Sequence, residues 1–206
     1  SDLPGRETQR LQANKEELVE RLTRTIRTDG VIHPLEGLYV GRTSIPFKRF
    51  HGILEPSFCV IAQGSKQVLL GNQCYQYDPF HYLLATVELP TISQVLEASK
   101  ENPYLSIRLE LNSQLVTSVL VEAEYSISPQ TSAETQAIHV SPIDVNLLDT
   151  VVRLIRLLDV PADAPILMPI IMREIIYRLV RGDQGRQLRQ LSVMGGYASL
   201  IARAIQ

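Results

Sequence analysis

The chain has 206 residues, of which 45% are hydrophobic and 20% charged, and its formal net charge at pH 7 is −2. This length and composition fit one globular domain with or without a helical appendage, and they exclude disorder or a coiled-coil rod for the whole chain. The weak negative charge excludes the clustered basic surface that DNA binding requires. Every apolar run is far shorter than the roughly 20 residues that span a bilayer, so we expect no membrane partner.

The chain contains two cysteines, Cys59 and Cys74. Two cysteines exclude a disulfide framework and a thiolate zinc cluster, and this usage is typical of proteins in a reducing compartment. We therefore expect a cytoplasmic protein.

The first element in chain order is a helix over residues 10–27, within an N-terminal segment that we place at residues 1–30. Its apolar side chains fall on one stripe, and most of its charged side chains lie outside that stripe. The stripe consists of Leu11, Leu18, Leu22 and Ile26. The pattern predicts an amphipathic helix.

Residues 31–140 have the pattern of a β domain, with short β-branched and aromatic runs separated by Gly, Pro and Asn. The runs 58–63 and 66–70 are separated by Gly64 and Ser65, a pair that suits a type II′ hairpin turn. Such regularly spaced strands predict a sandwich or a barrel. The end of this domain, at residues 126–139, is rich in Ser, Thr, Gln and Ala and reads as a connector.

One segment of the β domain, residues 104–111, alternates between apolar and polar side chains. Leucine and isoleucine occupy one face, and Ser106, Arg108 and Glu110 occupy the other. This alternation predicts a half-buried strand. The next segment, residues 112–120, starts with good helix-capping residues and predicts a short helix, with another strand as the alternative.

Residues 141–206 are predicted to be helical. Ser141 is a suitable N-cap with Pro142 at the first helical position, and this helix is expected to stop at Pro161. A second helix is expected over residues 163–182, so the two form an αα-hairpin. Two short helices are expected after it, at residues 184–193 and 197–206.

Six segments of the sequence resemble the N-terminal domain of one branch of AraC-type transcription regulators, and the resemblance covers roughly residues 25–206. Four segments lie in the β domain and two in the helical region: Glu55–Lys66, Tyr75–Pro79, Tyr82–Leu84, Pro103–Leu105, Leu154–Asp159 and Pro169–Val180. The resemblance implies an α+β, mainly β fold, in which a cupin-like jelly-roll β-barrel is followed by a helical dimerisation hairpin. It also implies a small-molecule effector, a homodimer, and DNA binding through a helix-turn-helix part outside this chain.

This resemblance divides the chain into the N-terminal helix at residues 1–30, an effector domain at 31–140, and a dimerisation and linker region at 141–206. The barrel mouth is the usual place for a small ligand in such folds. Candidate ligand-binding residues are the polar and aromatic residues of strand-like segments: Tyr39, Arg42, His51, Tyr77, His81, Tyr82 and Arg108. An arginine inside a barrel can bind a carboxylate in bidentate fashion, although Arg108 could equally pair with Glu88 or Glu110.

The alternative function is a metal-dependent cupin enzyme, such as an oxygenase or isomerase. Enzymes of this kind hold iron or manganese with two closely spaced histidines, a glutamate and a later histidine. The sequence offers His51, Glu55 and His81 but no paired histidine. We therefore predict a non-enzymatic regulator without metal or cofactor, and a third possibility is an interaction module whose barrel binds nothing.

The dimer seam is predicted on the two helices of the αα-hairpin, because they carry more apolar positions than one barrel face can cover. The candidate interface residues are Leu148, Val152, Ile155, Ile171 and Ile175.

Overall fold

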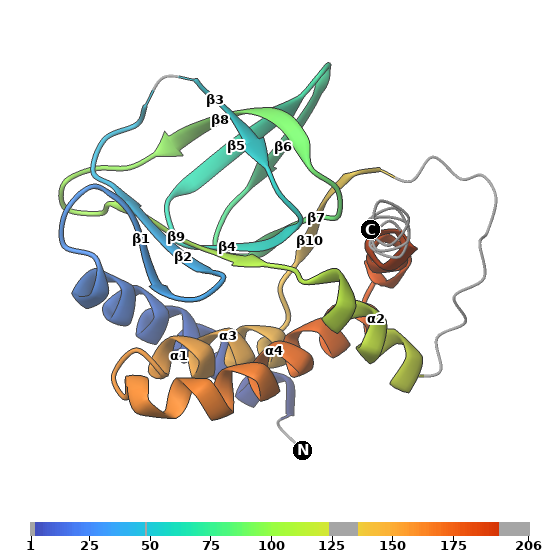
Figure 1. The fold of residues 1–206 in the computed structure, drawn as a ribbon. Coiled ribbons are helices and arrows are strands. Elements are labelled where there is room, and N and C mark those ends of the chain that lie inside the picture. Colours follow the sequence, from blue (N-terminus) through green and yellow to red (C-terminus); the bar gives the residue numbers. More distant parts are fainter. Residues whose placement is uncertain (1–2, 48, 124–135, 194–206) are drawn as a thin grey trace.

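The computed structural model describes residues 3–47, 49–123 and 136–193, and Figure 1 gives the arrangement of its elements. Two antiparallel sheets face each other to form a barrel-like β domain, and helices cover the outer face of one sheet (Figure 1). The expected α+β fold, a cupin-like β-barrel followed by a helical hairpin, is confirmed.

The larger sheet has six strands and the smaller sheet has four. In spatial order the larger sheet contains β1 (Gly30–Leu35), β2 (Leu38–Thr43), β9 (Tyr104–Glu110), β4 (Ser57–Gln63), β7 (His81–Ala85) and β10 (Ile138–Pro142). The smaller sheet contains β3 (Phe50–Leu54), β8 (Leu89–Glu97), β5 (Ser65–Leu70) and β6 (Gln73–Tyr77).

The six-stranded sheet separates two hydrophobic cores. On its outer face Leu105, Ile107 and Leu109 of β9 pack in one core with the helices. On its inner face Cys59 and Leu83 belong to a second core shared with the smaller sheet. Because both faces of this sheet are covered, β4 and β7 are almost wholly buried, whereas β9 alternates between buried and half-buried residues.

The chain passes from one sheet to the other at Gly64, where the sequence predicts a hairpin. That prediction is wrong, because β4 and β5 belong to different sheets and are not paired with each other. Gly64 has a φ of +86°, and a Cβ added there would lie 2.4 Å from the carbonyl oxygen of Glu97. The positive φ and the close approach of the two backbones therefore both require glycine. The true two-residue hairpin joins β5 to β6, where Leu70 pairs with Gln73.

Three helices share the outer core with the larger sheet: α1 (Leu3–Thr25), α3 (Val145–Arg156) and α4 (Ala164–Arg181). α1 contacts strands β4 and β9, α3 packs against α1, and α4 packs against α3 and α2 (Ser113–Glu122). The predicted stripe of α1 is the face that packs, since Leu18, Leu22 and Ile26 are buried in the outer core. A single-turn 3₁₀ helix, Pro161–Asp163, leads into α4, which includes Pro169 without ending there.

The short helix predicted after the alternating strand is confirmed as α2 (Ser113–Glu122). The Asn112 side chain accepts hydrogen bonds from the backbone N–H groups of Gln114 and Leu115, at 2.9 and 3.0 Å. A cap of this kind satisfies two of the donors that a helix start leaves unpaired, which is why asparagine marks the boundary.

The predicted start of α3 is wrong by several residues. Ser141 and Pro142 belong to the edge strand β10, and Asp144 caps the helix by accepting hydrogen bonds from the N–H groups of Asn146 and Leu147, both 2.8 Å long. An edge strand tolerates proline because one of its sides needs no backbone donor. The segment predicted as a connector, residues 126–139, therefore ends within a strand, and its residues 126–135 lie outside the described part of the chain.

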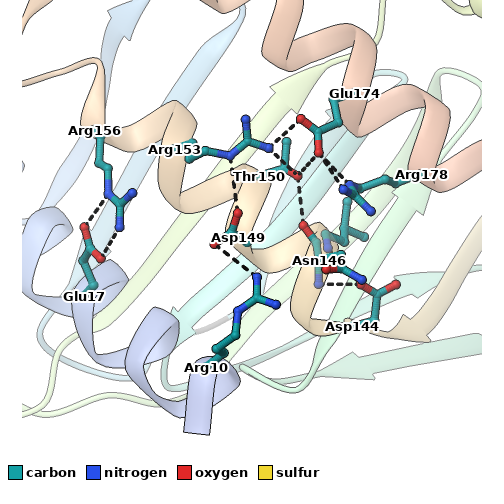
Figure 2. A network of polar contacts seen from close by, with 11 residues as sticks. Arg10, Glu17, Asp144, Asn146, Asp149, Thr150, Arg153, Arg156, Glu174 and Arg178 are labelled. Atoms are coloured by element: carbon teal, nitrogen blue, oxygen red, sulfur yellow. Dashed lines mark hydrogen bonds and ion pairs between the residues drawn. The ribbon is translucent and has the colours of Figure 1, made fainter. Parts of the chain in front are cut away.

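Charged side chains join α1, α3 and α4 on the surface away from the sheet (Figure 2). Glu17 of α1 accepts two hydrogen bonds from the Arg156 guanidinium, both 2.7 Å long. Arg153 of α3 lies 2.5 Å from a carboxylate oxygen of Glu174 in α4. These pairs fix the three helices against one another where apolar packing ends.

Residues 185–193 are helical, close to the prediction of 184–193, and the helix predicted at 197–206 lies outside the described residues. Among the helices that the structure describes, none has the length and apolar character needed to cross a bilayer.

Candidate functional site: the cavity between the sheets

A cavity of about 340 Å³ lies between the two sheets, at the end formed by β1, β2, β3, β8 and β9. Its wall from the larger sheet includes Tyr39, Gly41, Ser106 and Arg108, and its wall from the smaller sheet includes Lys66, Thr91, Ser93 and Val95. This volume lies at the lower end of the range for small-molecule sites.

The polar face of β9 lines this cavity. Leu105, Ile107 and Leu109 are needed by the outer core, so strand alternation turns Ser106 and Arg108 into the space between the sheets. Gly41 pairs with Ser106 across β2 and β9, and a Cβ at Gly41 would lie 2.9 Å from the Ser106 hydroxyl oxygen. A larger residue at this position would therefore fill part of the cavity.

Arg108 is positioned by an aromatic ring and by long ion pairs. Its guanidinium carbon lies 3.7 Å from the centroid of the Tyr39 ring, and its Nη1 lies 3.8 Å from Glu55 and 4.0 Å from Glu110. Ion pairs of this length are weaker than a bidentate pair, so the guanidinium keeps donors for a further acceptor. The Tyr39 hydroxyl donates to Glu110, and this hydrogen bond raises the pKa of Tyr39.

Lys66 brings a second cation to the cavity from the opposite sheet. Burial lowers the pKa of its ammonium group, and the nearby Arg108 lowers it further, while Cys59 opposes this shift. Among the described residues, no carboxylate lies within ion-pairing distance of Lys66. A desolvated cation without a counter-charge is costly, so this part of the cavity favours an anion.

The rest of the wall combines hydroxyl groups with apolar surface. Thr91, Ser93 and Tyr104 supply hydroxyls, and burial raises the pKa of Tyr104, which keeps its phenol protonated. Phe47 and Leu54 supply apolar contact area. The cavity therefore suits a small molecule with an anionic group and an apolar body.

The structure brings together three of the seven predicted ligand-binding residues. Tyr39, Arg42 and Arg108 line the cavity, and Arg42 is also bound to Asp29 at 2.5 Å. The other four lie elsewhere: Tyr77 and Tyr82 are buried in the two hydrophobic cores, His51 is exposed on β3, and His81 is hydrogen-bonded to Asp78 at 2.8 Å.

The three residues considered as metal ligands, His51, Glu55 and His81, do not form a cluster. His51 lies on the smaller sheet and His81 on the larger sheet, and Glu55 faces Arg108. Within residues 3–47, 49–123 and 136–193, no group of three His, Cys, Asp or Glu side chains is arranged to hold a metal ion. The two cysteines also lie on different sheets, with Cys59 buried and Cys74 exposed.

Sequence reasoning missed several cavity residues: Lys66, Thr91, Ser93, Tyr104 and Ser106. Lys66 is the first residue of the run predicted to follow a hairpin turn at Gly64 and Ser65, and that hairpin does not exist. A usable signal was the polar face of β9, because Ser106 lies on the same face of the strand as Arg108, which was a candidate.

All five predicted seam residues are buried within the chain itself: Leu148, Val152, Ile155, Ile171 and Ile175. They pack in the outer core, between the helices and the larger sheet. The exposed apolar residues of the hairpin lie instead on the opposite side of α4, at Ile166, Leu167, Ile170 and Tyr177.

Two facing antiparallel sheets with a polar cavity between them, followed by a helical hairpin, form the cupin-like class of fold that the resemblance implies. Residues 34–187 match the family described as AraC-type transcriptional regulator N-terminus. The chain belongs to this family, and it is a regulatory domain of a transcription regulator. No curated protein matches the sequence.

The chain is also similar to solved structures of ToxT from Vibrio cholerae. An apo variant from strain SCE256 gives a TM-score of 0.46 at 10% identity, covering 70% of this chain and 56% of that chain. The fatty-acid-bound wild-type protein of the same strain gives 0.46 at 10% identity, covering 76% and 57%. ToxT from strain O395 gives 0.44 at 12% identity, covering 71% and 55%. The chain thus spans little more than half the length of these proteins.

Proposed function

We propose that this chain is the effector-sensing and dimerisation part of a cytoplasmic transcription regulator, and that its effector is a small anionic molecule bound between the two sheets. In this proposal DNA is bound by a helix-turn-helix part of the protein outside this chain. The chain's own net charge of −2 gives it no basic surface for that task.

The observation that carries the proposal is the Lys66 ammonium group, which lines the cavity without a carboxylate partner among the described residues. A lysine that served only packing could be replaced by an apolar residue without this desolvation cost. An anion between Lys66 and Arg108 would remove the cost and would also engage the free donors of the guanidinium. The apolar wall at Phe47 and Leu54 would take the remainder of the molecule.

The proposed dimer forms through the exposed face of α4. Ile166, Ile170 and Tyr177 lie four and seven residues apart, so they share one side of the helix. A groove of about 880 Å³ also borders α4, and its lining includes Leu115 and Met168. An exposed apolar helix face is typical of an interaction site, and a second copy would cover it by pairing the same face with itself.

A thermal-shift screen tests the effector proposal. The purified chain is heated with a panel of small aliphatic and aromatic carboxylates, each paired with its neutral amide. We expect at least one carboxylate to raise the melting temperature while its amide does not, because the amide lacks the charge that Lys66 needs. Equal stabilisation by acids and amides would contradict the anionic class, and a dose-dependent shift that survives Lys66→Met would place binding elsewhere.

A further inference from the structure

The helix at residues 185–193, which we call the latch helix, is attached to the β domain largely by polar side chains. Gln184, at its start, donates a hydrogen bond to the Ser141 hydroxyl of β10. Near its end, Ser192 shares a hydrogen bond of 2.6 Å with Thr117 of α2. Residues 184–193 are thus fastened at two points, Gln184 and Ser192, to elements that precede α4 in the chain.

Apolar packing of the latch helix is modest. Leu188 and Leu191 are its buried apolar side chains, and both belong to the outer core. By comparison, α4 buries seven residues, six of them large and apolar. Since apolar area supplies most of the free energy of packing, the described residues 185–193 contribute less of it than α4 does.

Two buried amide groups oppose the docked position. The side-chain carbonyl oxygens of Gln184 and Gln187 are buried and have no hydrogen-bond partner among the described residues. A carbonyl group that leaves water without gaining a donor loses its hydration free energy, and undocking returns that free energy. The docked arrangement is therefore stabilised by the hydrogen bonds to Ser141 and Thr117 and destabilised by the two unpartnered carbonyl oxygens.

The backbone between α4 and the latch helix allows a change of direction. Gly182 caps α4 in an extended conformation, and Gly185 lies so close to Val180 that a Cβ would be 2.2 Å from its carbonyl oxygen. Only glycine permits this tight reversal, and segments of this kind absorb backbone rotation when an element moves.

The attachment point at Ser141 is connected to the cavity through the larger sheet. A row of directly paired residues runs from Arg108 through Cys59 and Leu83 to Val140, and Ser141 is the next residue of β10. All four side chains of this row lie on the inner face, whereas Ser141 points to the outer face where the latch helix docks. A shift of these strands would therefore reach both the cavity and the Ser141 contact.

We propose that the latch helix is a two-state element, which undocks from β10 and α2 while the β domain and the α3–α4 hairpin stay folded. The role of this undocking rests on the proposed function. The latch helix lies between the effector-sensing β domain and the residues that follow it in the chain, so undocking would change how the β domain constrains those residues. The undocking itself is independent of any effector, and its test needs none.

Hydrogen exchange of the purified chain, followed by mass spectrometry, tests this proposal. We expect backbone amides of residues 185–193 to exchange at least an order of magnitude faster than those of α3, through a local opening. Ser141→Ala should speed their exchange on the order of tenfold, because Gln184 loses its partner. Gln187→Met should slow it by a similar factor, since it removes an unpartnered carbonyl group at nearly constant size. The exposed Gln76→Met on β6 is the matched control and should leave it unchanged.

Two results would overturn the proposal. In the first, the backbone amides of residues 185–193 exchange no faster than those of α3, which would mean that the latch helix opens only with global unfolding. The other is a Gln187→Met protein whose latch exchanges as fast as the wild type or faster. If Ser141→Ala does not fold, Ser192→Ala replaces it, because this change removes the contact with Thr117 at the other end and should also speed exchange.

Discussion

The guanidinium of Arg108 lies over the ring of Tyr39, with 3.7 Å between the guanidinium carbon and the ring centroid. The two residues are directly paired across β2 and β9, so the register of two strands sets this contact. The stack restrains the long arginine side chain before any ligand arrives, which reduces the entropy that binding must overcome. Arg108 is thus a preorganised donor, whereas Lys66 is the charge that lacks a counterpart.

Replacing Lys66 by methionine should stabilise the chain. We expect Lys66→Met to raise the free energy of unfolding at pH 7 by about 1 kcal/mol, because the substitution removes a desolvated charge and keeps the volume. Since the folded-state pKa of Lys66 is lowered from 10.5, the unfolded chain binds more protons between those two pKa values. Wild-type stability should therefore rise with pH in that window, and the advantage of Lys66→Met should shrink toward pH 10.5.

Urea unfolding between pH 7 and pH 9.5 measures this difference. The exposed Lys100→Met is the control, and it should change stability little at any of these pH values. A Lys66→Met protein that is less stable than the wild type at pH 7 would mean that the ammonium group is stabilised rather than penalised by its surroundings.

The contact between α1 and α3 makes a second pH prediction, in which stability again rises with pH but in the acidic range. Hydrogen bonds from Arg156 lower the pKa of Glu17 to about 2, with a smaller contribution from Arg21. Glu17→Gln should lower the free energy of unfolding at pH 7 by roughly 0.5–1 kcal/mol, because both partners are partly exposed. The contribution of a carboxylate with a depressed pKa is complete above its unfolded value of 4.5 and is lost as the pH falls toward about 2.

Thermal unfolding from pH 7 to pH 2.5 should therefore show the wild type converging on Glu17→Gln. Glu20 is the matched control on the same helix, because in the described part of the chain its one ion pair is with Arg24, at 3.5 Å. At pH 7, Glu20→Gln should lower the free energy of unfolding by less than Glu17→Gln does. If the gap between wild type and Glu17→Gln were constant across this range, the ion pair would not be its cause.

Two neighbouring isoleucines of α4 lie on different surfaces, one on the proposed dimer seam and the other in the outer core. Ile170 is 59% exposed and Ile171 is 7% exposed. We expect Ile170→Glu to give a folded monomer, because the new carboxylate lies in the seam, and Ile171→Glu to unfold the chain, because it places an unpaired charge in the outer core. Sedimentation at tens of micromolar with circular dichroism distinguishes these outcomes. A wild-type monomer at that concentration would contradict the seam.

Two glycines with positive φ should differ in their tolerance of alanine. Gly71 has a φ of +56° and open space around its Cβ position, so Gly71→Ala should cost about 1–2 kcal/mol of strain alone. Gly64→Ala should cost clearly more, because its Cβ would also collide with the Glu97 carbonyl group. Chemical denaturation of the two variants makes the comparison, and equal costs would mean that the sheet crossing at Gly64 is loosely packed.

The sequence alone predicted the elements and their order well, because periodicity is a local property. The stripe of Leu18, Leu22 and Ile26, the alternation in β9 and the cap at Asn112 each depend on neighbours in the chain. Errors arose where a residue's role is set by distant partners. Gly64 had the right backbone conformation for a hairpin, yet the chain there passes between two sheets.

The candidate site was harder to predict for the same reason. Arg108 was recognised because an arginine in an alternating strand is conspicuous, but nothing local distinguishes the half-buried Lys66, which lines the cavity, from a surface lysine. The residues predicted for the seam do not lie on the exposed face: Ile155 and Ile171 satisfy helical periodicity, and other parts of this same chain already cover them. Periodicity identifies an apolar face without saying what packs against it.

The most direct test of the account is calorimetric titration of the carboxylate that gives the largest thermal shift. It should bind the wild type and the Lys100→Met control with equal affinity, and both Lys66→Met and Arg108→Met should weaken binding at least tenfold, as expected for losing a charge-assisted contact. The Lys66→Met protein should bind the carboxylate more weakly although it is more stable than the wild type. Unchanged affinity in the Lys66→Met protein would contradict the claim that this cavity recognises an anion through Lys66.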